Sequence, residues 1–392
     1  MRRIPGTRFL HSPGPTHVPD EVLNAMHRQP MDHGDPRLDE VIAAIDVGIK
    51  RLLQTKTAEL YMFASNGHGA WEAAIENLLA PGQTVLIPGT GHFSESWAVQ
   101  TEALGRRVIR TPFREGHPID PQAVEQALRA DVKREIAAVF AVHTDTASST
   151  TSDLAALRAA IDAAGHPALF VVDVVASLAA APFAMDAMRV NVAVGATQKG
   201  LMSPPGMSFV AVDRRADEVA ARNPAPRYYW DWGRRKGDQS YRKFCGTPPQ
   251  NLLYGVEAAL SLLFLEGIDA IIARHAQLAR AVHAAVECWS REGAVMFHCR
   301  VPQARSVSVT TIETRAGIDP EAMRTVARER FQVAIAGGLG PQGGRAFRIG
   351  HLGNLNSAMI LGCLAGVEAA MKVQGIPYGR GGMEAAIASL GG

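Results

Sequence analysis

Cysteine and unbalanced charge are both scarce in this sequence. Its 392 residues include four cysteines, Cys245, Cys288, Cys299 and Cys363, and none of them forms a Cys-x-x-Cys pair. This spacing argues against a disulfide framework and a structural zinc site, and it is typical of reduced thiols in a cytoplasmic protein. With 40 Lys and Arg against 38 Asp and Glu, the net charge is only +2. We therefore expect no nucleic-acid partner, because no basic excess is available to bind a phosphate backbone.

Long apolar runs are missing as well. A helix that spans a bilayer needs roughly 18 or more apolar residues, and the best candidate, 174–185, is bounded by Asp173 and Asp186. A proline, a glycine and an arginine within residues 5–8 interrupt the apolar segment that a signal peptide would need. We therefore expect no membrane partner and a cytoplasmic location. A chain of this length can also bury enough apolar surface to fold without a metal.

The composition that is present belongs to a globular α/β protein. Hydrophobic residues make up 47% and charged residues 20%, and at about 150 residues per domain the length allows two or three domains. Short apolar, β-branched runs alternate with helical patterns, which indicates a mostly parallel sheet covered by helices on both faces. The expected strands are 60–64, 84–87, 107–109, 136–142, 169–172, 192–195 and 208–212, and the helices between them are 70–79, 94–104, 121–130 and 154–164.

The pattern differs on either side of this region. Four prolines keep residues 5–19 out of regular helix. Amphipathic helices are expected at 20–27 and 38–54, and long helical stretches at 252–263 and 270–288. A second set of elements follows, with strand 306–312, helix 320–330, strand 346–349 and helix 358–372. We therefore predict an N-terminal arm (1–19), a large domain (20–255) and a smaller α+β C-terminal domain (256–392).

Two candidate binding features follow predicted strands. The turn 65–69, Ser-Asn-Gly-His-Gly, opens a helix, and its small residues would let an anion such as phosphate approach the backbone N–H groups. The same glycines are also compatible with a tight turn and nothing more. Asp173 ends a strongly apolar strand, where a carboxylate is costly unless it is paired. Asp173 therefore either accepts a hydrogen bond from a cationic ring nitrogen or caps the segment that follows.

Two cationic residues complete the set. Lys199 follows another strand and is flanked by small residues. Desolvation there would lower its pKa and make it a usable nucleophile or base, unless it is an ordinary surface lysine. Arg348 lies inside a predicted strand near the glycine-rich segment 337–340, and its guanidinium fits the carboxylate either of a ligand or of a nearby acidic residue. Together these features match a pyridoxal-phosphate enzyme for amino acids, in which the lysine forms a Schiff base and the aspartate keeps the ring nitrogen charged.

The order of these motifs resembles that of the class V aminotransferases, and within them the serine–glyoxylate and alanine–glyoxylate group. The similarity covers nearly the whole chain, from Ser12 to the helix after His351. Its motifs are SNGH (65–68), VVDVVASL (171–178), TQKGLMSPPG (197–206), GGLG (337–340) and FRIGHLG (347–353). The resemblance implies the type I pyridoxal-phosphate fold and a homodimer with its active sites at the subunit interface.

The resemblance also implies roles for individual residues. Lys199 corresponds to the lysine that binds the cofactor, Asp173 to the partner of the ring nitrogen, and Arg348 to the arginine that binds the substrate carboxylate. The other implied cofactor contacts are Asn66, Gly67 and His68 in the phosphate turn, Phe93 over the ring, Thr146 near O3′, Val175 under the ring, Gln198 near the phosphate, and Thr247 donated by the other subunit.

The sequence departs from the family pattern at three places. Phe244 stands where some relatives have a tyrosine, so one phosphate hydroxyl is missing. Residues 32–36 lack the His-Arg pattern that is common in this substrate-facing stretch. An aromatic and basic segment, 228–236, is either dimer surface or a lid over the side chain of the amino donor.

We therefore expect a transaminase that moves an amino group from serine or alanine to glyoxylate or pyruvate by a ping-pong mechanism. Three alternatives stay open. One is a class V transaminase for ureidoglycine, pyridoxamine or an aminophosphonate. For the aminophosphonate donor, Arg234, Arg235 or Arg345 would supply the extra positive charge. The others are a desulfurase-type lyase, for which no cysteine is well placed, and a regulator that only holds the cofactor.

Overall fold

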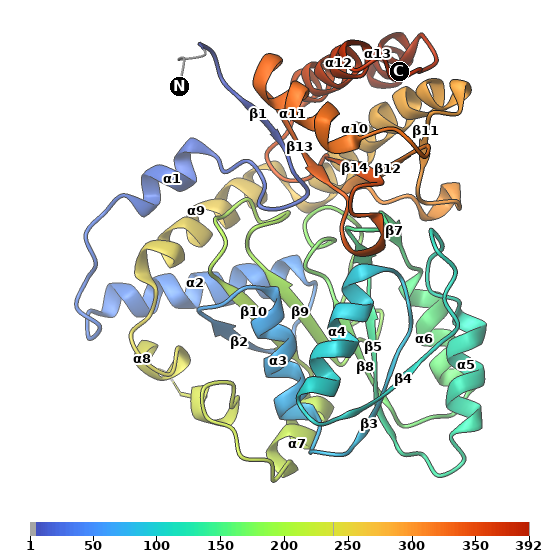
Figure 1. Cartoon of the computed structure of the whole chain (residues 1–392). Coiled ribbons are helices and arrows are strands. Elements are labelled where there is room, and N and C mark those ends of the chain that lie inside the picture. Colours follow the sequence, from blue (N-terminus) through green and yellow to red (C-terminus); the bar gives the residue numbers. More distant parts are fainter. Residues whose placement is uncertain (1–4, 238, 392) are drawn as a thin grey trace.

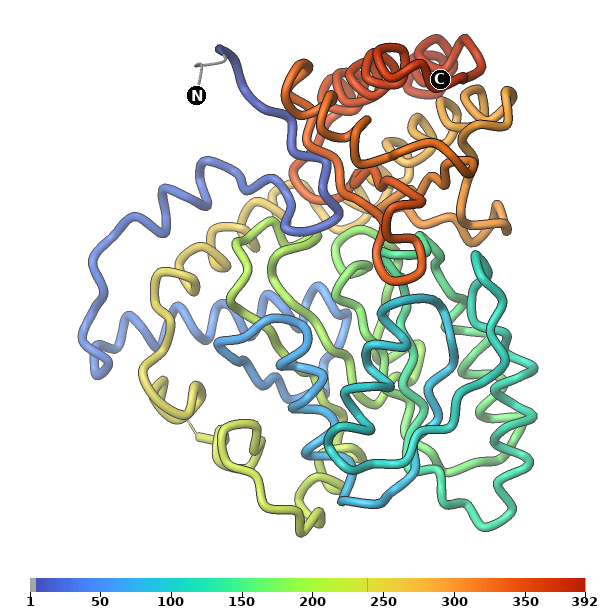
Figure 2. Tube along the Cα trace, in the orientation of Figure 1, coloured from blue at the N-terminus to red at the C-terminus, as the bar shows by residue number. Residues whose placement is uncertain are grey.

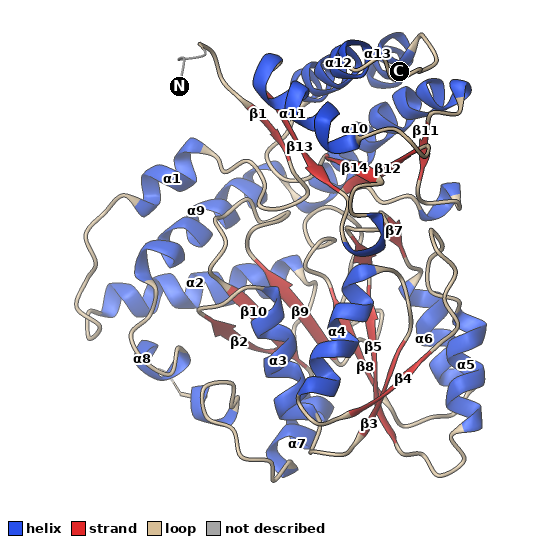
Figure 3. Ribbon diagram, viewed as in Figure 1, coloured by secondary structure: helices blue, strands red, loops and turns tan. Residues whose placement is uncertain are grey.

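The computed structural model describes residues 5–237 and 239–391, which form two lobes of different size (Figure 1). The large lobe is built on a seven-stranded sheet and the small lobe on a five-stranded sheet (Figure 3). The chain passes from the large to the small lobe through α9 (Gln250–Glu266) and α10 (Ile268–Trp289), as the trace in Figure 2 shows.

The large sheet is mostly parallel. Its order is β2-β10-β9-β8-β5-β3-β4, and β10 runs antiparallel to the other six strands. The carboxyl ends of the other six strands therefore lie at one edge, where ligands bind in open α/β sheets. The strands are β2 (Glu59–Phe63), β3 (Thr84–Ile87), β4 (Arg107–Arg110), β5 (Ile136–Val142), β8 (Leu169–Asp173), β9 (Val192–Ala196) and β10 (Ser208–Val212), and β6 (Thr144–Asp145) pairs with β7 (Thr150–Thr151) beside them.

Helices cover both faces of this sheet. Successive side chains of a strand point to opposite faces, and the buried side chains accordingly form two clusters. One face packs against α2, α5, α6 and α9, and the other against α3, α4 and α7. The helices of the large lobe that precede α9 are α1 (Asp20–Met26), α2 (Pro36–Leu52), α3 (Gly67–Leu78), α4 (His92–Ala103), α5 (Pro121–Ala130), α6 (Leu154–Ala163), α7 (Arg214–Arg222) and α8 (Ser240–Lys243).

The small lobe also includes the N-terminal arm. Its sheet has the order β1-β13-β14-β12-β11, in which β1 pairs in parallel with β13. The strands are β1 (Phe9–His11), β11 (Val295–Phe297), β12 (Val309–Thr314), β13 (Val333–Gly337) and β14 (Ala346–Gly350). The buried cluster around this sheet includes side chains of α10 and of α11 (Pro320–Arg330), α12 (Ser357–Val373) and α13 (Gly382–Gly391). Short 3-10 helices lie at Gly233–Arg235, Ser290–Glu292, Pro302–Ala304 and Gly340–Gln342.

Aspartate caps and prolines explain where several helices begin. Asp35, Asp120, Asp153 and Asp213 each accept a backbone N–H in the first turn of the helix that follows. Proline occupies the first turn of α2, α5 and α11, where its missing N–H costs no helical hydrogen bond.

Most predicted elements are present, and three strands (84–87, 136–142 and 208–212) and two helices (121–130 and 320–330) match to the residue. The predicted strand 306–312 is wrong at its start, because β12 begins at Val309. Ser306 and Ser308 bind the large lobe instead: the Ser306 N–H donates to Ser149 O at 3.0 Å and Ser308 Oγ to Ala176 O at 2.7 Å. Eight strands and α-helices of the described chain had no counterpart in the prediction, namely β1, β6, β7, β11, β13, α7, α8 and α13.

The two cores meet within α10. Ile271 packs into the core of the large lobe and Leu278 into that of the small lobe. The division into an arm, a large domain and a small domain, with a boundary at residue 255, stays a prediction. No helix in the described part of the chain is both long and apolar enough to cross a membrane.

Gly350 lies where the arm crosses β14. A Cβ at this position would lie 2.5 Å from the carbonyl carbon of Ser12 and 2.6 Å from the nitrogen of Pro13. Because both obstacles are backbone atoms, we expect Gly350→Ala to displace the arm and lower the free energy of unfolding by about 1–3 kcal/mol. Thermal unfolding would measure the loss. Gly391→Ala is the control, since a Cβ there meets no atom within 4 Å; equal midpoints for the two variants would contradict this packing.

Candidate active site

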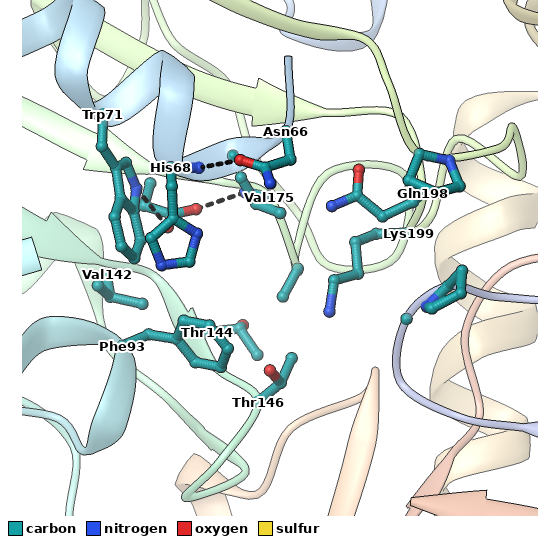
Figure 4. A pocket seen from close by; sticks show the side chains of 16 residues that line it. Asn66, His68, Trp71, Phe93, Val142, Thr144, Thr146, Val175, Gln198 and Lys199 are labelled. Atoms are coloured by element: carbon teal, nitrogen blue, oxygen red, sulfur yellow. Dashed lines mark hydrogen bonds between the residues drawn. The ribbon is translucent and has the colours of Figure 1, made fainter. Parts of the chain in front are cut away.

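Five loops that follow parallel strands enclose a cavity of about 260 Å³ at the carboxyl edge of the large sheet (Figure 4). They follow β2, β3, β5, β8 and β9, so residues far apart in the sequence meet there. Nine of the predicted site residues line this cavity: Asn66, Gly67, His68, Phe93, Thr146, Asp173, Val175, Gln198 and Lys199. The small lobe contributes Gly14 and Pro15 of the N-terminal arm.

The turn predicted to bind phosphate is the start of α3. The Asn66 side chain caps this helix and accepts the N–H groups of His68 at 3.1 Å and Gly69 at 3.4 Å. A Cβ on Gly67 would lie 3.3 Å from the Val175 side chain, so glycine permits a close approach of backbone here. Burial, and to a lesser extent the charge on His92, lowers the pKa of His68. A lowered pKa favours the neutral imidazole, so the N-terminus of α3 and its dipole, and not a charge on His68, supply the attraction for an anion.

Asp173 ends β8 and faces the same side of the sheet as Val171, toward α3. Its Oδ1 accepts the Val175 N–H at 2.6 Å, and its Oδ2 accepts the Trp71 indole N–H at 2.9 Å. Burial raises the pKa of this carboxyl to about 7, against the opposing effect of these donors and of Lys199. Among the described residues no Lys, Arg or His forms an ion pair with Asp173, so the carboxylate has neutral partners only.

Lys199 is not a surface lysine. Its side chain is partly buried and points into the cavity (Figure 4). The Nζ donates to Pro13 O at 2.7 Å, and a Cβ on Gly14 would lie 2.5 Å from Lys199 Nζ. Burial and the charge on Arg348 lower the pKa of the amine to about 8. The neutral, nucleophilic form is therefore accessible near neutral pH.

Arg348 lies in β14, close to the cavity but not among its lining residues. Its Nε donates to Gly337 O at 2.6 Å and its Nη1 to Thr146 O at 3.0 Å. Burial lowers the pKa of the guanidinium to about 10, while the charge on Asp145 opposes this shift. No carboxylate of the described residues forms a salt bridge with Arg348, so the internal ion pair that the sequence left open is not found in this part of the chain.

Trp71 and Asp145 are neighbours of the predicted site that the sequence interpretation missed. Asp145 is fully buried, and its carboxylate accepts the Phe93 N–H at 2.9 Å and the Ala147 N–H at 2.9 Å. It thereby ties the turn that carries Phe93 to the turn that carries Thr146. A signal for Trp71 was present, since it follows Gly67 by one helical turn and must share its face of α3.

Thr247 lies outside the cavity. It is an exposed residue of the segment between α8 and α9, and Phe244 three residues before it is buried in the core of the large lobe. Residues 32–36, the second departure from the family pattern, are described but do not line the cavity.

The segment 228–236 packs against β2 and α3. The guanidinium of Arg235 donates to Met62 O at 3.0 Å and Lys243 O at 2.9 Å, and Trp232 stacks on Tyr61 with ring centroids 5.5 Å apart. No residue of this segment lines the cavity of its own chain. Arg234 and Arg345 are exposed and lie outside the lining as well.

These residues fit pyridoxal phosphate. A buried carboxylate with no cationic partner among the described residues, a partly buried lysine amine and a helix start surround one cavity, with Phe93 on its wall. The Gln198 side-chain oxygen is buried and finds no hydrogen-bond partner within the described chain, so it can accept a hydrogen bond from a donor group of a ligand. The individual roles of the site residues stay predictions.

The lowered pKa of Lys199 predicts an unusual pH dependence. At pH 8 roughly half of this amine is neutral, against less than about 1% for an ordinary lysine with a pKa near 10.4. In the cofactor-free protein we expect the labelling rate of Lys199 by trinitrobenzenesulfonate to rise with pH and level off above about 8. Peptide mass spectrometry measures the rate, with the exposed Lys56 as internal reference. A rate that still rises steeply beyond pH 10 would contradict the lowered pKa.

Comparison with known proteins identifies the family. Residues 8–343 match the model of the family described as aminotransferase class-V. The chain is 37% identical over 392 residues to a serine–glyoxylate aminotransferase of Methylorubrum extorquens, covering 99% of this chain and 96% of the relative. It is 37% identical over 368 residues to an L-aspartate–glyoxylate aminotransferase of Paracoccus denitrificans, covering 93% and 91% of the two chains.

The structural comparison agrees with this result. A ureidoglycine–glyoxylate aminotransferase of Bacillus subtilis superposes with a TM-score of 0.90 at 25% identity and covers 100% of both chains. The predicted α/β fold of the type I pyridoxal-phosphate enzymes is thereby confirmed. The chain belongs to the class V aminotransferase family, whose members are enzymes that depend on pyridoxal phosphate.

Proposed function

We propose that this aminotransferase moves the amino group of a small amino acid, serine or alanine, to glyoxylate or pyruvate by a ping-pong mechanism. The observation that carries the proposal is that two desolvated groups, the Asp173 carboxyl and the Lys199 amine, line the same cavity. The names of two relatives, serine–glyoxylate and L-aspartate–glyoxylate aminotransferase, support glyoxylate as the acceptor.

When bound, pyridoxal phosphate supplies an aldehyde that condenses with amines and a ring that accepts electrons. Asp173 would accept the ring N–H and keep the ring nitrogen protonated. The N-terminus of α3 would bind the phosphate, and Phe93 would pack over the ring face. Lys199 Nζ, as the neutral amine, would remove the proton from the substrate Cα and deliver it to C4′, the aldehyde carbon of the cofactor.

Arg348 would bind the substrate carboxylate. Its guanidinium is held by two carbonyl oxygens, one from each lobe, and is buried without an ion pair among the described residues. The same fork would hold the amino acid in one half-reaction and the 2-oxo acid in the other, since both carry a carboxylate at the same place.

The charge of the cavity favours a small neutral donor. The described residues that line it include no arginine, and Lys199 is their single lysine. A dicarboxylic donor such as aspartate would need a second cation for its side chain. Arg348, which lies outside the lining, is already assigned to the carboxylate that all these donors share, so the lining supports serine and alanine ahead of aspartate within the proposal.

A homodimer forms part of the proposal. Thr247 is exposed and away from the cavity of its own chain, which is compatible with its donation to the phosphate of a second subunit. Sedimentation of the active enzyme should give the mass of two chains; full activity in a monomer would contradict this part. A cytoplasmic location is likewise proposed, from the scattered cysteines.

The desulfurase-type alternative needs a reactive thiolate. Cys288 and Cys363 are buried in α10 and α12. Burial raises the pKa of the Cys299 thiol, which disfavours its thiolate form. Cys245 is half-buried, and it does not line the cavity. The described chain therefore offers no support for cysteine desulfuration, and a non-catalytic regulator has no supporting feature among the described residues either.

Half-reactions with a panel of amino acids test the proposal. We expect serine and alanine to change the absorbance of the bound cofactor fastest, ahead of aspartate, ureidoglycine, pyridoxamine and an aminophosphonate. In steady state, Arg348→Gln should raise KM for the amino acid and for glyoxylate by about tenfold or more, because a charge-assisted fork is lost.

Arg345→Gln is the matched control, since Arg345 is exposed and does not line the cavity. It should leave both KM values unchanged. A fastest half-reaction with pyridoxamine or an aminophosphonate would replace the proposed donor, and an unchanged KM in Arg348→Gln would remove the assigned role of Arg348.

A further inference from the structure

Trp71 connects the two ends of the cofactor site. It lies in α3 and is almost fully buried. Its indole N–H donates to Asp173 Oδ2 at 2.9 Å, and its ring centroid lies 4.6 Å from that of His68. Figure 4 shows Trp71 beside His68 on one wall of the cavity, with the hydrogen bond drawn as a dashed line.

The backbone dictates this contact. Trp71 follows Gly67 by four residues and His68 by three, so all three share one face of α3. Asp173 faces α3 because alternate residues of β8 point to that side. The hydrogen bond therefore joins the helix that starts at the phosphate turn to the strand that carries the carboxylate.

The two hydrogen bonds of Asp173 are not equivalent. The Val175 N–H, at 2.6 Å from Oδ1, belongs to the same turn and moves with the carboxylate. Trp71 is the side-chain donor found for Asp173 among the described residues, and it comes from a separate element. The Trp71 hydrogen bond is therefore the contact that can fix the orientation of the carboxylate relative to α3.

Trp71 is itself held rigidly. Its ring stacks on Trp97 with centroids 5.2 Å apart and planes 10° apart, and Trp97 stacks on Phe140 at 4.7 Å. These rings belong to the core cluster on the α3 and α4 face of the sheet. A donor fixed by packing needs no reorganisation when a ligand arrives.

We infer that Trp71 is a positioning residue whose indole N–H orients the Asp173 carboxylate and keeps it ionised to accept the ring N–H of pyridoxal phosphate. This inference rests on the proposed pairing of Asp173 with the cofactor. Burial raises the pKa of Asp173 to about 7, while the Val175 and Trp71 N–H groups and the charge on Lys199 lower it and that on Asp145 raises it. Loss of the indole N–H removes one of the lowering effects, so the carboxyl would take up its proton at a higher pH.

The chain offers a matched control in Trp97. It is a buried member of the same stack, but its indole nitrogen has no hydrogen-bond partner in the described part of the chain. Trp71→Phe and Trp97→Phe each replace one indole of the stack by a phenyl ring. Only the first removes a donor from Asp173.

The experiment measures dissociation constants of the cofactor-free wild type and variants from pH 6 to 9, with two probes. One probe is pyridoxal phosphate, and the other is its 1-deaza analogue, in which a C–H replaces the ring nitrogen. We expect Trp71→Phe to raise the dissociation constant of pyridoxal phosphate about tenfold. The loss of affinity that occurs at low pH should begin at a higher pH in this variant. Trp97→Phe should stay within about twofold of wild type, and the deaza analogue should bind Trp71→Phe as it binds wild type.

Two results would overturn the inference. An equal loss of affinity for both probes in Trp71→Phe would assign Trp71 a packing role only, and an unchanged affinity for both would assign it none. Asp173→Ala separates these failures from a failure of the proposed function. If Asp173→Ala weakens the binding of pyridoxal phosphate and Trp71→Phe does not, only the inference fails. If Asp173→Ala leaves this binding unchanged as well, the proposed pairing of Asp173 with the cofactor fails.

Discussion

The site depends on removing a carboxylate and an amine from water at one edge of a parallel sheet. Asp173 and Lys199 follow the adjacent strands β8 and β9. Burial raises the pKa of the first to about 7 and lowers that of the second to about 8. Among residues 5–237 and 239–391, each is hydrogen-bonded only by neutral groups, Asp173 by Trp71 and Val175 and Lys199 by Pro13. Unpaired buried charge is costly, and a ligand that brings a cationic ring nitrogen and an aldehyde relieves both deficits.

The second constraint is that the site spans both lobes. Arg348 belongs to the small sheet but donates to Thr146 O in the large lobe. The N-terminal arm joins the small sheet through β1, and its Pro13 carbonyl accepts Lys199 Nζ. A substrate that contacted Lys199 and Arg348 together would therefore couple the positions of the two lobes. Gly14, against the Lys199 side chain, and Gly350, where the arm packs on β14, leave no room for a side chain.

The sequence predicted those parts of the fold that depend on local pattern. Apolar, β-branched runs such as 136–142 are buried on both faces and matched their strands. Strand β13 was missed because its Val-Ala-Ile-Ala-Gly run is short and shows no alternation of apolar and polar residues. Strand β1 was missed because it has three residues, which pair with a strand more than 300 positions away. The start of β12 was misplaced because Ser306 and Ser308 find partners in the other lobe, which no local signal reveals.

The same limit applies to the site. Motifs at strand ends placed nine predicted residues around one cavity, since the edge where parallel strands end is shared. Trp71 and Asp145 are hydrogen-bonded to Asp173 and to the Phe93 turn. The helical period could have placed Trp71 on the face of Gly67, but these hydrogen-bond partners became visible only in the structure. Thr247 lies away from the cavity of its own chain, so its predicted contact with the cofactor of a second subunit stays a proposal.

Reductive trapping tests the central claim most directly. Pyridoxal phosphate is bound to the protein, the linkage is reduced with borohydride, and the modified peptide is identified by mass spectrometry. The account predicts that the phosphopyridoxyl group is found on Lys199, with labelling strongly reduced in Asp173→Ala at the same cofactor concentration. Attachment to a different lysine, or labelling of Lys199 that is indifferent to the loss of Asp173, would contradict it.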